Sequence, residues 1–512
     1  MLVKTFGSAV YGIKAITIQL EVNISQGVNF YLVGLPDNAV KESQQRIESA
    51  LQTHGYRMPG KKVVINMAPA DIRKEGSAYD LPLAIGILAG SEQIMPDKLN
   101  DYIIMGELSL DGSLQPIKGV LPIALQARDE GFKGIVLPVQ NAREAAVVDG
   151  IKVYGAENIK QVINFFNQTE DIPETTIDIH QEFLAKINGY DVDFADVKGQ
   201  ENVKRALEIA AAGGHNIIMI GPPGAGKTML AKRLSTILPP LTLNEALETT
   251  KIHSVAGKID KNSSLITTRP FRSPHHTISD VALVGGGTFP QPGEISLSHN
   301  GVLFLDELPE FKRTVLEVMR QPLEDRLITI SRAKFTVEYP ASFMLVASMN
   351  PCPCGYYNHP DKNCVCTAGV VQKYLNKISG PLLDRIDIHI EVVPVAFEKL
   401  SEQRLAESSH VIRERVVNAR NIQANRFSGS KGVHCNAQMS SKMLRKHCEI
   451  DAAGQTLLKN AMEKLGLSAR AYDRILKVSR TIADLEQNET IQSYHLAEAI
   501  QYRSLDRENW AG

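Results

Sequence analysis

The sequence has little of several features that mark specialised classes of protein. Its 512 residues include six cysteines, too few for a scaffold held together by disulfides. Basic and acidic residues nearly balance, 56 against 57, and the net charge is −1. No overall positive field therefore marks the surface for nucleic acid or for an anionic membrane. A local basic channel remains compatible with this balance.

Long apolar runs are also missing. The longest, such as Leu81 to Gly90, fall well short of the roughly 20 residues that span a bilayer. The N-terminal stretch lacks an apolar core followed by a small-residue cleavage site, as a signal peptide would have. We therefore predict a cytoplasmic protein with no membrane partner. Apolar residues make up 43% of the chain, and its length predicts about two to four globular units.

The chain divides into four segments of different character. Residues 1–167 alternate short β-branched runs with helix-like stretches, which is typical of an α/β domain. Residues 168–193 are acidic and lack a sustained apolar period, so they suit a linker or a short connecting helix. Residues 194–395 repeat strand, glycine-rich turn and helix, which indicates a parallel-sheet nucleotide-binding core. Residues 396–512 carry charged helical patterns and predict a helical bundle.

A glycine-rich loop lies between an apolar strand, 216–220, and a predicted helix, 228–238. Successive backbone N–H groups in such a loop cradle phosphate oxygens, and the helix N-terminus adds to their attraction. Lys227 should reach the β- and γ-phosphates, and the Thr228 hydroxyl should bind Mg²⁺. The sequence therefore predicts binding of ATP with Mg²⁺. The loop consists of Gly221, Pro222, Pro223, Gly224, Ala225, Gly226, Lys227 and Thr228.

Groups suited to hydrolysis follow two further apolar strands. Asp306 and Glu307 come directly after the strand 301–305. Asp306 can hold magnesium, while Glu307 can polarise the attacking water. A solvated acidic turn is the alternative, and the five apolar residues before the two carboxylates argue against it. Asn350 ends a strand that starts at Ser342, and its amide can orient the water.

Three arginines are candidates to neutralise charge on the γ-phosphate. Arg385 follows Asp384, and a guanidinium there would act as an arginine finger on the ATP of a neighbouring subunit. An internal salt bridge with Asp384 or Asp387 is the alternative. Arg470 and Arg474 begin the last long helical stretch and could close over the nucleotide from the helical segment.

Long motifs of the chain resemble the magnesium-chelatase-like AAA+ proteins, and the likeness covers nearly all of the sequence. It implies an N-terminal Lon-protease-like α/β domain, a P-loop AAA+ core with a parallel sheet, and a C-terminal helical lid. The motifs are DVKGQ (196–200), PFRSPHHTISDVALVGGG (270–287), PGEISLSHNGVLFLDELPEF (292–311), GPLLDRIDIHIEV (380–392) and SARAYDRILKVSRTIADL (468–485).

The resemblance also implies roles for single residues and for the whole protein. It makes Asn350 sensor 1, Arg385 the finger in trans, and Arg470 sensor 2 with Arg474 as the alternate. It implies an ATP-driven hexameric DNA helicase that acts on single-stranded, duplex or branched DNA. Such a helicase would promote branch migration and help to integrate incoming DNA during natural transformation. The alternatives are a metal-chelatase-type motor that remodels a protein partner and an ATP-dependent peptidase.

The Lon-like segment lacks the residues of a peptidase. Lon-like proteases carry a serine in a Lys-Asp-Gly-Pro-Ser-Ala-Gly stretch and a lysine after a Gly-Gly-Leu turn, and the lysine activates the serine. The corresponding positions here are Ala78 and Leu121. Ser77 and Lys118 lie one and three residues away, and such a shift along a strand turns a side chain elsewhere. We predict a non-proteolytic scaffold.

Four cysteines lie close together in the loop 352–366. Four thiolates in one loop of a cytosolic protein can bind a zinc ion in tetrahedral geometry. Their Cys-x-Cys spacing is tighter than the common gap of two to four residues, and reduced thiols packed in a loop are the alternative. The candidate ligands are Cys352, Cys354, Cys364 and Cys366.

A predicted hairpin offers a surface for DNA. Two β-like runs, 327–330 and 335–338, flank a basic tip that contains Arg332 and Lys334. Contact with phosphates requires only lysine or arginine, so these two residues are our candidates. Phe289, in a glycine-rich segment, is a candidate for stacking on bases. A solvated surface turn is the alternative reading of the hairpin tip.

Overall fold

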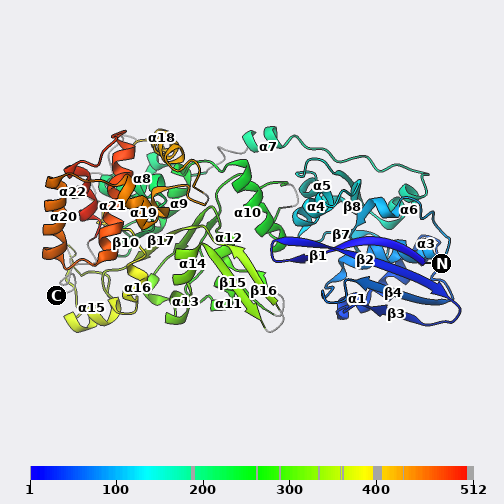
Figure 1. Ribbon diagram of the computed structural model, residues 1–512. Helices are drawn as coiled ribbons and strands as arrows, with labels where there is room; N and C mark the ends of the chain where they lie inside the picture. Colours follow the sequence, from blue (N-terminus) through cyan, green and yellow to red (C-terminus); the bar gives the residue numbers. More distant parts are fainter. Residues whose placement is uncertain are drawn as a thin grey trace.

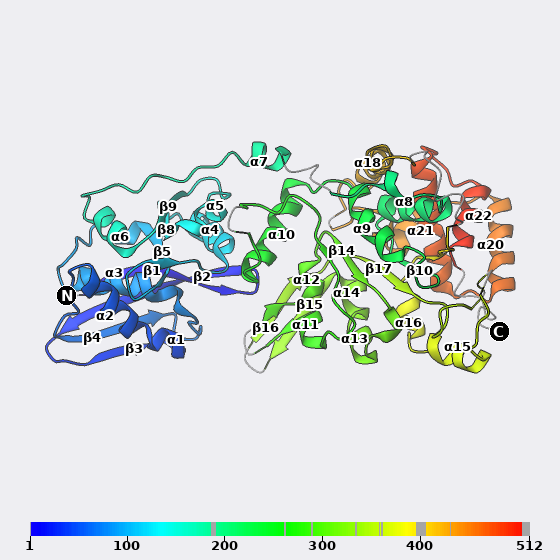
Figure 2. The same cartoon turned by 180° about the vertical axis from the view of Figure 1, so that it is seen from behind.

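The structure is a computed structural model that describes residues 2–185, 191–260, 263–287, 290–332, 335–357, 359, 362–395, 406–430 and 432–503. The molecule is elongated (Figure 1). An N-terminal α/β half lies at one end, a parallel sheet with its helices lies in the middle, and the C-terminal helices lie at the other end. The reverse view shows the same order (Figure 2).

The N-terminal half is built on a seven-stranded mixed sheet of order β3-β4-β2-β1-β5-β8-β9. The α3 sequence DLPLAIGILAG is buried at every position, because helix α3 lies against β1 and β2. The strands of the sheet are β1 (Leu2–Tyr11), β2 (Lys14–Ser25), β3 (Phe30–Val33), β4 (Lys62–Ala68), β5 (Tyr102–Ile104), β8 (Gly134–Pro138) and β9 (Lys152–Ala156). Its helices are α1 (Asn38–Lys41), α2 (Ser43–Thr53), α3 (Asp80–Gly90), α4 (Val120–Asp129), α5 (Val139–Ala145) and α6 (Ile159–Phe166). A small hairpin, β6 (Glu107–Leu108) and β7 (Leu114–Gln115), and helix α7 (Ile179–Ala185) complete it.

The central core is a five-stranded sheet of order β11-β14-β17-β10-β18. All its neighbouring strands run parallel, so the predicted α/β core with a parallel sheet is confirmed. The first strand of the core in sequence, β10, lies between the last two. The strands are β10 (Ile217–Ile220), β11 (Phe271–Arg272), β14 (Val302–Leu305), β17 (Met344–Met349) and β18 (Ile388–Glu391).

Helices and a long hairpin surround this sheet. The predicted hairpin is confirmed: β15 (Leu327–Arg332) pairs antiparallel with β16 (Phe335–Pro340), and Arg332 lies opposite Phe335. The helices are α8 (Glu201–Gly213), α9 (Lys227–Ile237), α10 (Leu243–Val255), α11 (Asp280–Val284), α12 (Glu294–Leu297), α13 (Arg313–Val318), α14 (Arg320–Asp325), α15 (Ala368–Leu375) and α16 (Gly380–Leu383). A short pair, β12 (Gly285–Gly286) and β13 (Gln291–Pro292), lies between α11 and α12.

The predicted C-terminal helical region is confirmed. Its helices are α18 (Ser409–Arg426), α19 (Ser441–His447), α20 (Ala452–Leu465), α21 (Ala469–Leu485) and α22 (Ser493–Gln501). Helices α18 and α21 pack against α8, and α18 also packs against α9. The apolar faces of these helices join one hydrophobic core with the strands β10 and β17. The C-terminal helices are therefore fixed to the core sheet.

Helix α10 connects the core to the N-terminal half. Its Ala246 is buried in the hydrophobic core of the N-terminal half, together with Leu241 before the helix and Leu265 after it. At its C-terminal end the Ser254 carbonyl accepts a hydrogen bond of 3.1 Å from Gly119 N. A second contact lies at the tip of the β1–β2 hairpin, where Tyr11 Oη donates to the Thr336 carbonyl of β16 at 3.2 Å. The two halves therefore meet both at α10 and at the tip of the β1–β2 hairpin.

Among the described residues, no helix combines the length and the apolar character that crossing a membrane requires.

The C-terminal helices contain a buried charged cluster around Asp484. Its carboxylate is 0% exposed and accepts hydrogen bonds from Arg426, Arg480 and Asn436. We predict that Asp484→Ala lowers the free energy of unfolding by about 3–5 kcal/mol, because two buried guanidinium groups lose their partner. Chemical denaturation measures this loss. The control is Glu463→Ala, which removes an exposed pair with Lys459 and should cost at most about 0.5 kcal/mol.

Candidate nucleotide site and cysteine loop

The phosphate loop connects β10 to α9, as the sequence predicts. Gly224 and Gly226 have φ values of 81° and 86°, which disfavour side chains other than glycine. At Gly221 a Cβ atom would lie 2.2 Å from the Val392 carbonyl oxygen. The loop is therefore shaped by glycine where its backbone bends, and Gly226 precedes the first residue of α9. Backbone N–H groups and a helix N-terminus suit the phosphates of a nucleotide.

Lys227 lies at the centre of this loop. Its Nζ donates to the carbonyls of Gly221 at 2.6 Å and Pro222 at 3.0 Å, and to Asn350 Oδ1 at 3.0 Å. Burial lowers the pKa of Lys227, and the nearby carboxylates of Asp306 and Glu307 oppose this shift. The structure thus brings together the loop lysine and the predicted water-orienting amide. They meet because Ile220 of β10 pairs with Met349 of β17.

Asp306 is surrounded by oxygen atoms. Thr228 Oγ1 donates to its Oδ2 at 2.6 Å, and Ser348 Oγ donates to its Oδ1. The register of β14 against β17, with Leu305 opposite Ala347, places Asp306 beside Ser348. Hydroxyl and carboxylate oxygens are the ligands that Mg²⁺ prefers, so the residues fit the predicted ion. Ser348 was missed from the sequence because only the strand pairing brings it here.

Glu307 points into a more open part of the site. Its side chain is 55% exposed, and His276 Nδ1 lies 3.5 Å from its Oε2. The ring of His276 lies against that of His275, with 4.0 Å between centroids. The structure thus places His276 beside the candidate general base. An exposed carboxylate next to the phosphate loop can polarise a water molecule.

Gln200 is a further residue that the sequence did not single out for the site. Its Nε2 donates to the Ala225 carbonyl in the phosphate loop at 2.9 Å and to the Val393 carbonyl at 3.1 Å. It belongs to the motif DVKGQ. The side chain therefore links the phosphate loop to the chain that follows β18.

The arginine candidates lie at the opposite edge of the core sheet. Arg474 pairs with Asp387 at 2.9 Å, and Asp387 accepts from Asn216 N at 3.2 Å. Asn216 precedes β10, whereas Gly221 follows it. At about 3.3 Å per residue, the two positions are about 16 Å apart. Within one chain, Arg474 therefore lies far from the phosphate loop, so its predicted place over a nucleotide requires the nucleotide of a neighbouring subunit.

Arg470 and Arg385 share this opposite edge. Arg470 pairs with Asp384 at 3.2 Å and is 62% exposed. The Arg385 side chain is 9% exposed, and its Nη2 lies 2.6 Å from Glu324 Oε1. The internal ion pair that was the alternative to a finger role is present, but its partner is Glu324 and not Asp384 or Asp387. Any action of Arg385 on a neighbour requires this pair to open.

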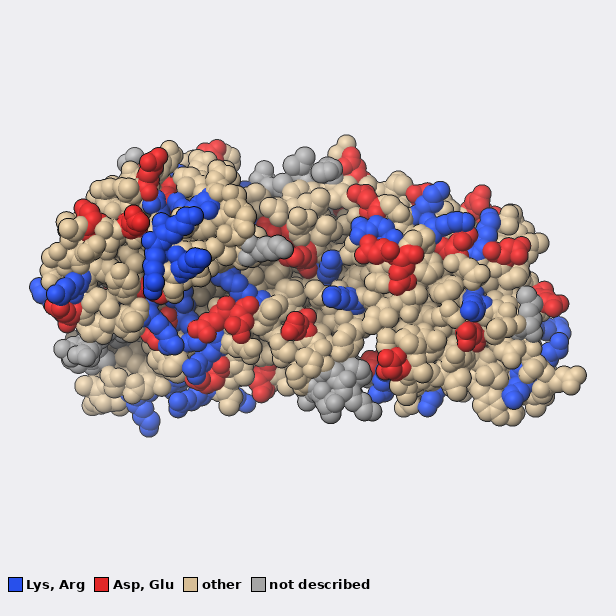
Figure 3. Space-filling view, in the orientation of Figure 1, with Lys and Arg blue, Asp and Glu red and all other residues tan. Residues whose placement is uncertain are grey.

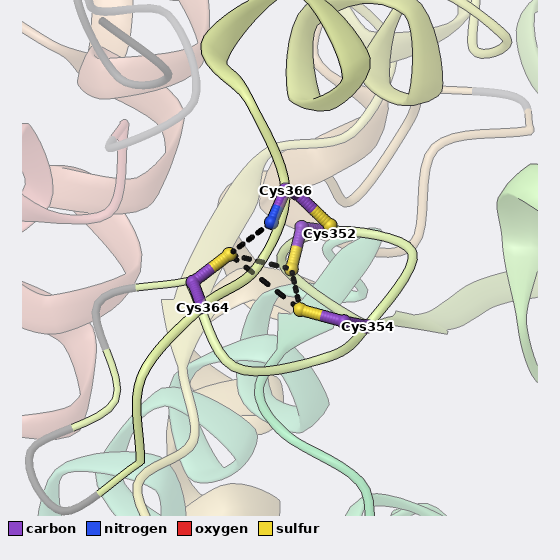
Figure 4. Close-up of side chains that lie close together, drawn as sticks. All are labelled: Cys352, Cys354, Cys364 and Cys366. Atoms are coloured by element: carbon purple, nitrogen blue, oxygen red, sulfur yellow. Dashed lines mark hydrogen bonds between the residues drawn. The ribbon is translucent and has the colours of Figure 1, made fainter.

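The four clustered cysteines come together in space (Figure 4). Their sulfur atoms all lie within 4.8 Å of one another. The Sγ atom of Cys352 is 3.3 Å from that of Cys354 and 3.7 Å from that of Cys364, and the last two are 3.5 Å apart. Four sulfurs at about 2.3 Å from a zinc ion would be about 3.8 Å apart. The cluster therefore fits a tetrahedral metal ion.

The charge of the cluster and its position also suit a structural metal. Burial raises the pKa of Cys354, but hydrogen bonds from Tyr356 N and Val365 N outweigh it and bring the pKa to about 6. A thiolate is the form that binds metal. A Cβ atom at Gly355 would lie 2.6 Å from Cδ of Pro223. The cysteine loop therefore touches the phosphate loop.

The residues at the former protease positions do not form a catalytic pair. Leu121 is fully buried, and its N–H donates to Glu144 at 3.0 Å. Ser77 donates its hydroxyl hydrogen bond to Glu107. The Lys118 side chain lies against Gly257 of the core. No hydrogen bond joins Ser77 to Lys118, so the displaced dyad is not assembled.

The DNA candidates are only partly covered by the structure. The backbone of Arg332 ends β15, but its side chain is not described. Lys334 and Phe289 lie outside the described residues.

The fold and the site together define a P-loop nucleotide-binding protein with a Lon-like N-terminal half. Three family models match the chain: "Magnesium chelatase, subunit ChlI" at residues 193–400, "Subunit ChlI of Mg-chelatase" at 20–141, and "Magnesium chelatase, subunit ChlI C-terminal" at 406–503. The chain belongs to the magnesium-chelatase-like family of AAA+ proteins. Membership of this family implies an ATPase that uses ATP with Mg²⁺.

Two relatives match the chain over nearly its whole length. The chain is 44% identical to the competence protein ComM of Haemophilus influenzae, over 98% of this chain and 97% of the relative. It is 43% identical to the uncharacterised protein YifB of Escherichia coli, over 98% of this chain and 96% of the relative. Lon protease 2 of Bacillus subtilis is 31% identical over 159 residues, which is 28% of this chain and 27% of that protein.

The geometry of the cysteine cluster predicts about one zinc ion per chain. We expect Cys352→Ser and Cys364→Ser each to lose most of the bound metal, because a hydroxyl is a poor substitute for a thiolate ligand. Elemental analysis of the purified proteins measures the metal content. The matched control is Cys448→Ser, a buried cysteine outside the cluster, which should keep the full content. Unchanged metal in both cluster variants would remove the zinc site.

Proposed function

We propose that this protein is an ATP-driven hexameric DNA translocase in the cytoplasm, which promotes branch migration and helps to integrate incoming DNA during natural transformation. The observation that carries the proposal is the division of charged groups between two edges of one sheet. The phosphate-binding and water-activating groups lie at the carboxyl edge, and the arginines lie at the amino edge. Subunits in a ring can join these edges.

The hydrolytic step uses the groups at the carboxyl edge. Glu307 accepts a proton from water as the water attacks the γ-phosphate, and Asn350 orients that water. Lys227 exchanges its bonds to loop carbonyls for phosphate oxygens. When bound through Thr228 and Asp306, Mg²⁺ neutralises phosphate charge. Sensor 1 and general base are thus held by neighbouring strands, which limits their movement.

The amino edge supplies the remaining cations to a neighbour. We assign Arg385 as the finger in trans, and Arg470 or Arg474 as sensor 2 of that same shared site. The exposed Glu324 pairs with Arg385 in the single chain and releases it when subunits associate. A guanidinium that is held away from its own nucleotide keeps a lone subunit inactive, so hydrolysis depends on assembly.

Two observations support a role in moving DNA. A full-length relative bears the name competence protein, which favours a role with incoming DNA. The β15–β16 hairpin projects from the core (Figure 1). In the sequence, the candidate Arg332 ends β15, Lys334 comes two residues later, and Phe289 belongs to the glycine-rich segment before the hairpin. By contrast, the magnesium-chelatase subunit ChlI of Olisthodiscus luteus matches only 32% of this chain at 23% identity. A chelatase motor is therefore the less supported function.

We expect Glu307→Gln to bind ATP as the wild type does but to hydrolyse it at least about 100-fold more slowly, because the general base is lost. Unwinding of a four-way DNA junction should fall in parallel. The control is Glu310→Gln, an exposed carboxylate three residues away that pairs with Lys377, and it should retain both activities. If wild-type protein hydrolyses ATP but moves no DNA substrate, the translocase proposal fails and the ATPase remains.

A further inference from the structure

A polar cavity lies between the C-terminal helices and the amino edge of the core sheet. Its volume is about 210 Å³. Asn216 and Asp387, which precede β10 and β18, line its floor, and Arg474 and Lys477 of α21 line its wall. Arg326, which connects α14 to β15, also lines the cavity. The cavity therefore joins three parts of the molecule and lies away from the phosphate loop.

The carboxylates of this cavity are already paired. Asp387 Oδ1 lies 2.9 Å from Arg474, and its Oδ2 lies 3.1 Å from His215 Nδ1. Glu324, the other acidic residue of the lining, pairs with Arg385 at 2.6 Å. The direct contacts of these carboxylates are thus with groups other than Arg326 and Lys477, although the charge of Asp387 also acts on both of these cations.

Two cations in the lining have only neutral partners. Lys477 Nζ donates to the Ala437 carbonyl at 3.0 Å, and Arg326 Nη1 donates to Ser342 Oγ at 3.3 Å. In the described part of the chain, no carboxylate oxygen lies within 4.0 Å of either group. Lys477 is 9% exposed, and burial together with Arg474 lowers its pKa to about 8.

A fourth cation adds to this positive charge. Gly214 lines the cavity, and a Cβ atom there would lie 3.2 Å from Nη2 of Arg420. Burial lowers the pKa of Arg326; Cys435 and Asp387 oppose this shift, and the charges of Arg420 and Arg474 add to it. Asp387 is the shared counter-charge of Arg326, Arg474 and Lys477, so positive charge exceeds negative charge here. Burying this excess charge is costly, and an anion in the cavity would reduce that cost.

We propose that this cavity binds a phosphate group. A planar guanidinium and an ammonium facing one polar space match the oxygens of a tetrahedral dianion better than those of a neutral ligand. The surface of the C-terminal helices is also basic. Figure 3 shows lysine and arginine side chains gathered over the C-terminal helices, and Lys442, Arg445 and Lys446 of α19 are exposed there.

The bound phosphate would connect the C-terminal helices to the hairpin. Arg326 directly precedes β15, while Lys477 and Arg474 belong to α21. One anion held by both would fix the base of the hairpin against the C-terminal helices. The phosphate comes either from a nucleotide on an adjoining subunit or from a DNA backbone. This inference goes beyond the proposed translocase, and phosphate binding can be tested without any movement of DNA.

The test uses full-length Lys227→Ala protein, so that the phosphate loop contributes little to binding. Isothermal titration with pyrophosphate should detect about one site per chain. Arg326→Gln and Lys477→Gln, each added to this background, should weaken binding at least about tenfold, because each removes a charge-assisted hydrogen bond. Lys477→Arg should retain most of the affinity. The control Lys446→Gln removes an exposed charge of α19 and should leave the affinity unchanged.

Two further arms identify the source of the phosphate. Displacement of pyrophosphate by a short DNA duplex assigns the site to the DNA backbone, and this displacement should be lost in Arg326→Gln. Affinity that increases on assembly and resists the duplex assigns the site to a neighbour's nucleotide. The proposal is overturned if the Lys227→Ala protein binds no pyrophosphate. It is equally overturned if Arg326→Gln and Lys477→Gln bind pyrophosphate as tightly as their parent.

Discussion

The parallel direction of the five core strands is the constraint on which the rest of the molecule depends. Because every strand points the same way, the residues that follow the strands share one edge and the residues that precede them share the other. Gly221, Asp306 and Asn350 each follow a strand. Asn216 and Asp387 each precede one. Two chemically different edges therefore arise from a single sheet, about 16 Å apart along the strands.

Each edge is supported by its own neighbours. At the carboxyl edge, the cysteine loop begins two residues after Asn350 and touches Pro223, so a metal there would hold the phosphate loop and Asn350, the candidate sensor 1, together. At the amino edge, α21 supplies Arg474 and Lys477, and the C-terminal helices fix this edge through α8. The N-terminal half contacts α10 and the β15–β16 hairpin, so it is placed to support the core and to influence the hairpin.

Local signals predicted the fold class and much of the nucleotide site. The phosphate loop and the Asp306–Glu307 pair are contiguous motifs, and the hairpin is a short-range pattern, so no long-range contact was needed to find them. Ser348 and His276 were missed as site residues because strand pairing and loop packing bring them to the carboxylates. The position of Arg474 at the amino edge was not predicted, for a similar reason. Helical periodicity identifies the apolar face of α21, but it does not say which edge of the sheet that helix joins.

The central claim is that two edges from different chains complete one site. The most direct test mixes Lys227→Ala protein, whose arginine edge is intact, with Arg385→Ala protein, whose phosphate loop is intact, and measures ATP hydrolysis across mixing ratios. Each variant alone should be nearly inactive, and the mixture should regain activity with a maximum at intermediate ratios, because some interfaces then pair two intact edges. If the variants assemble together and every mixture stays as inactive as its components, the site is not shared between chains.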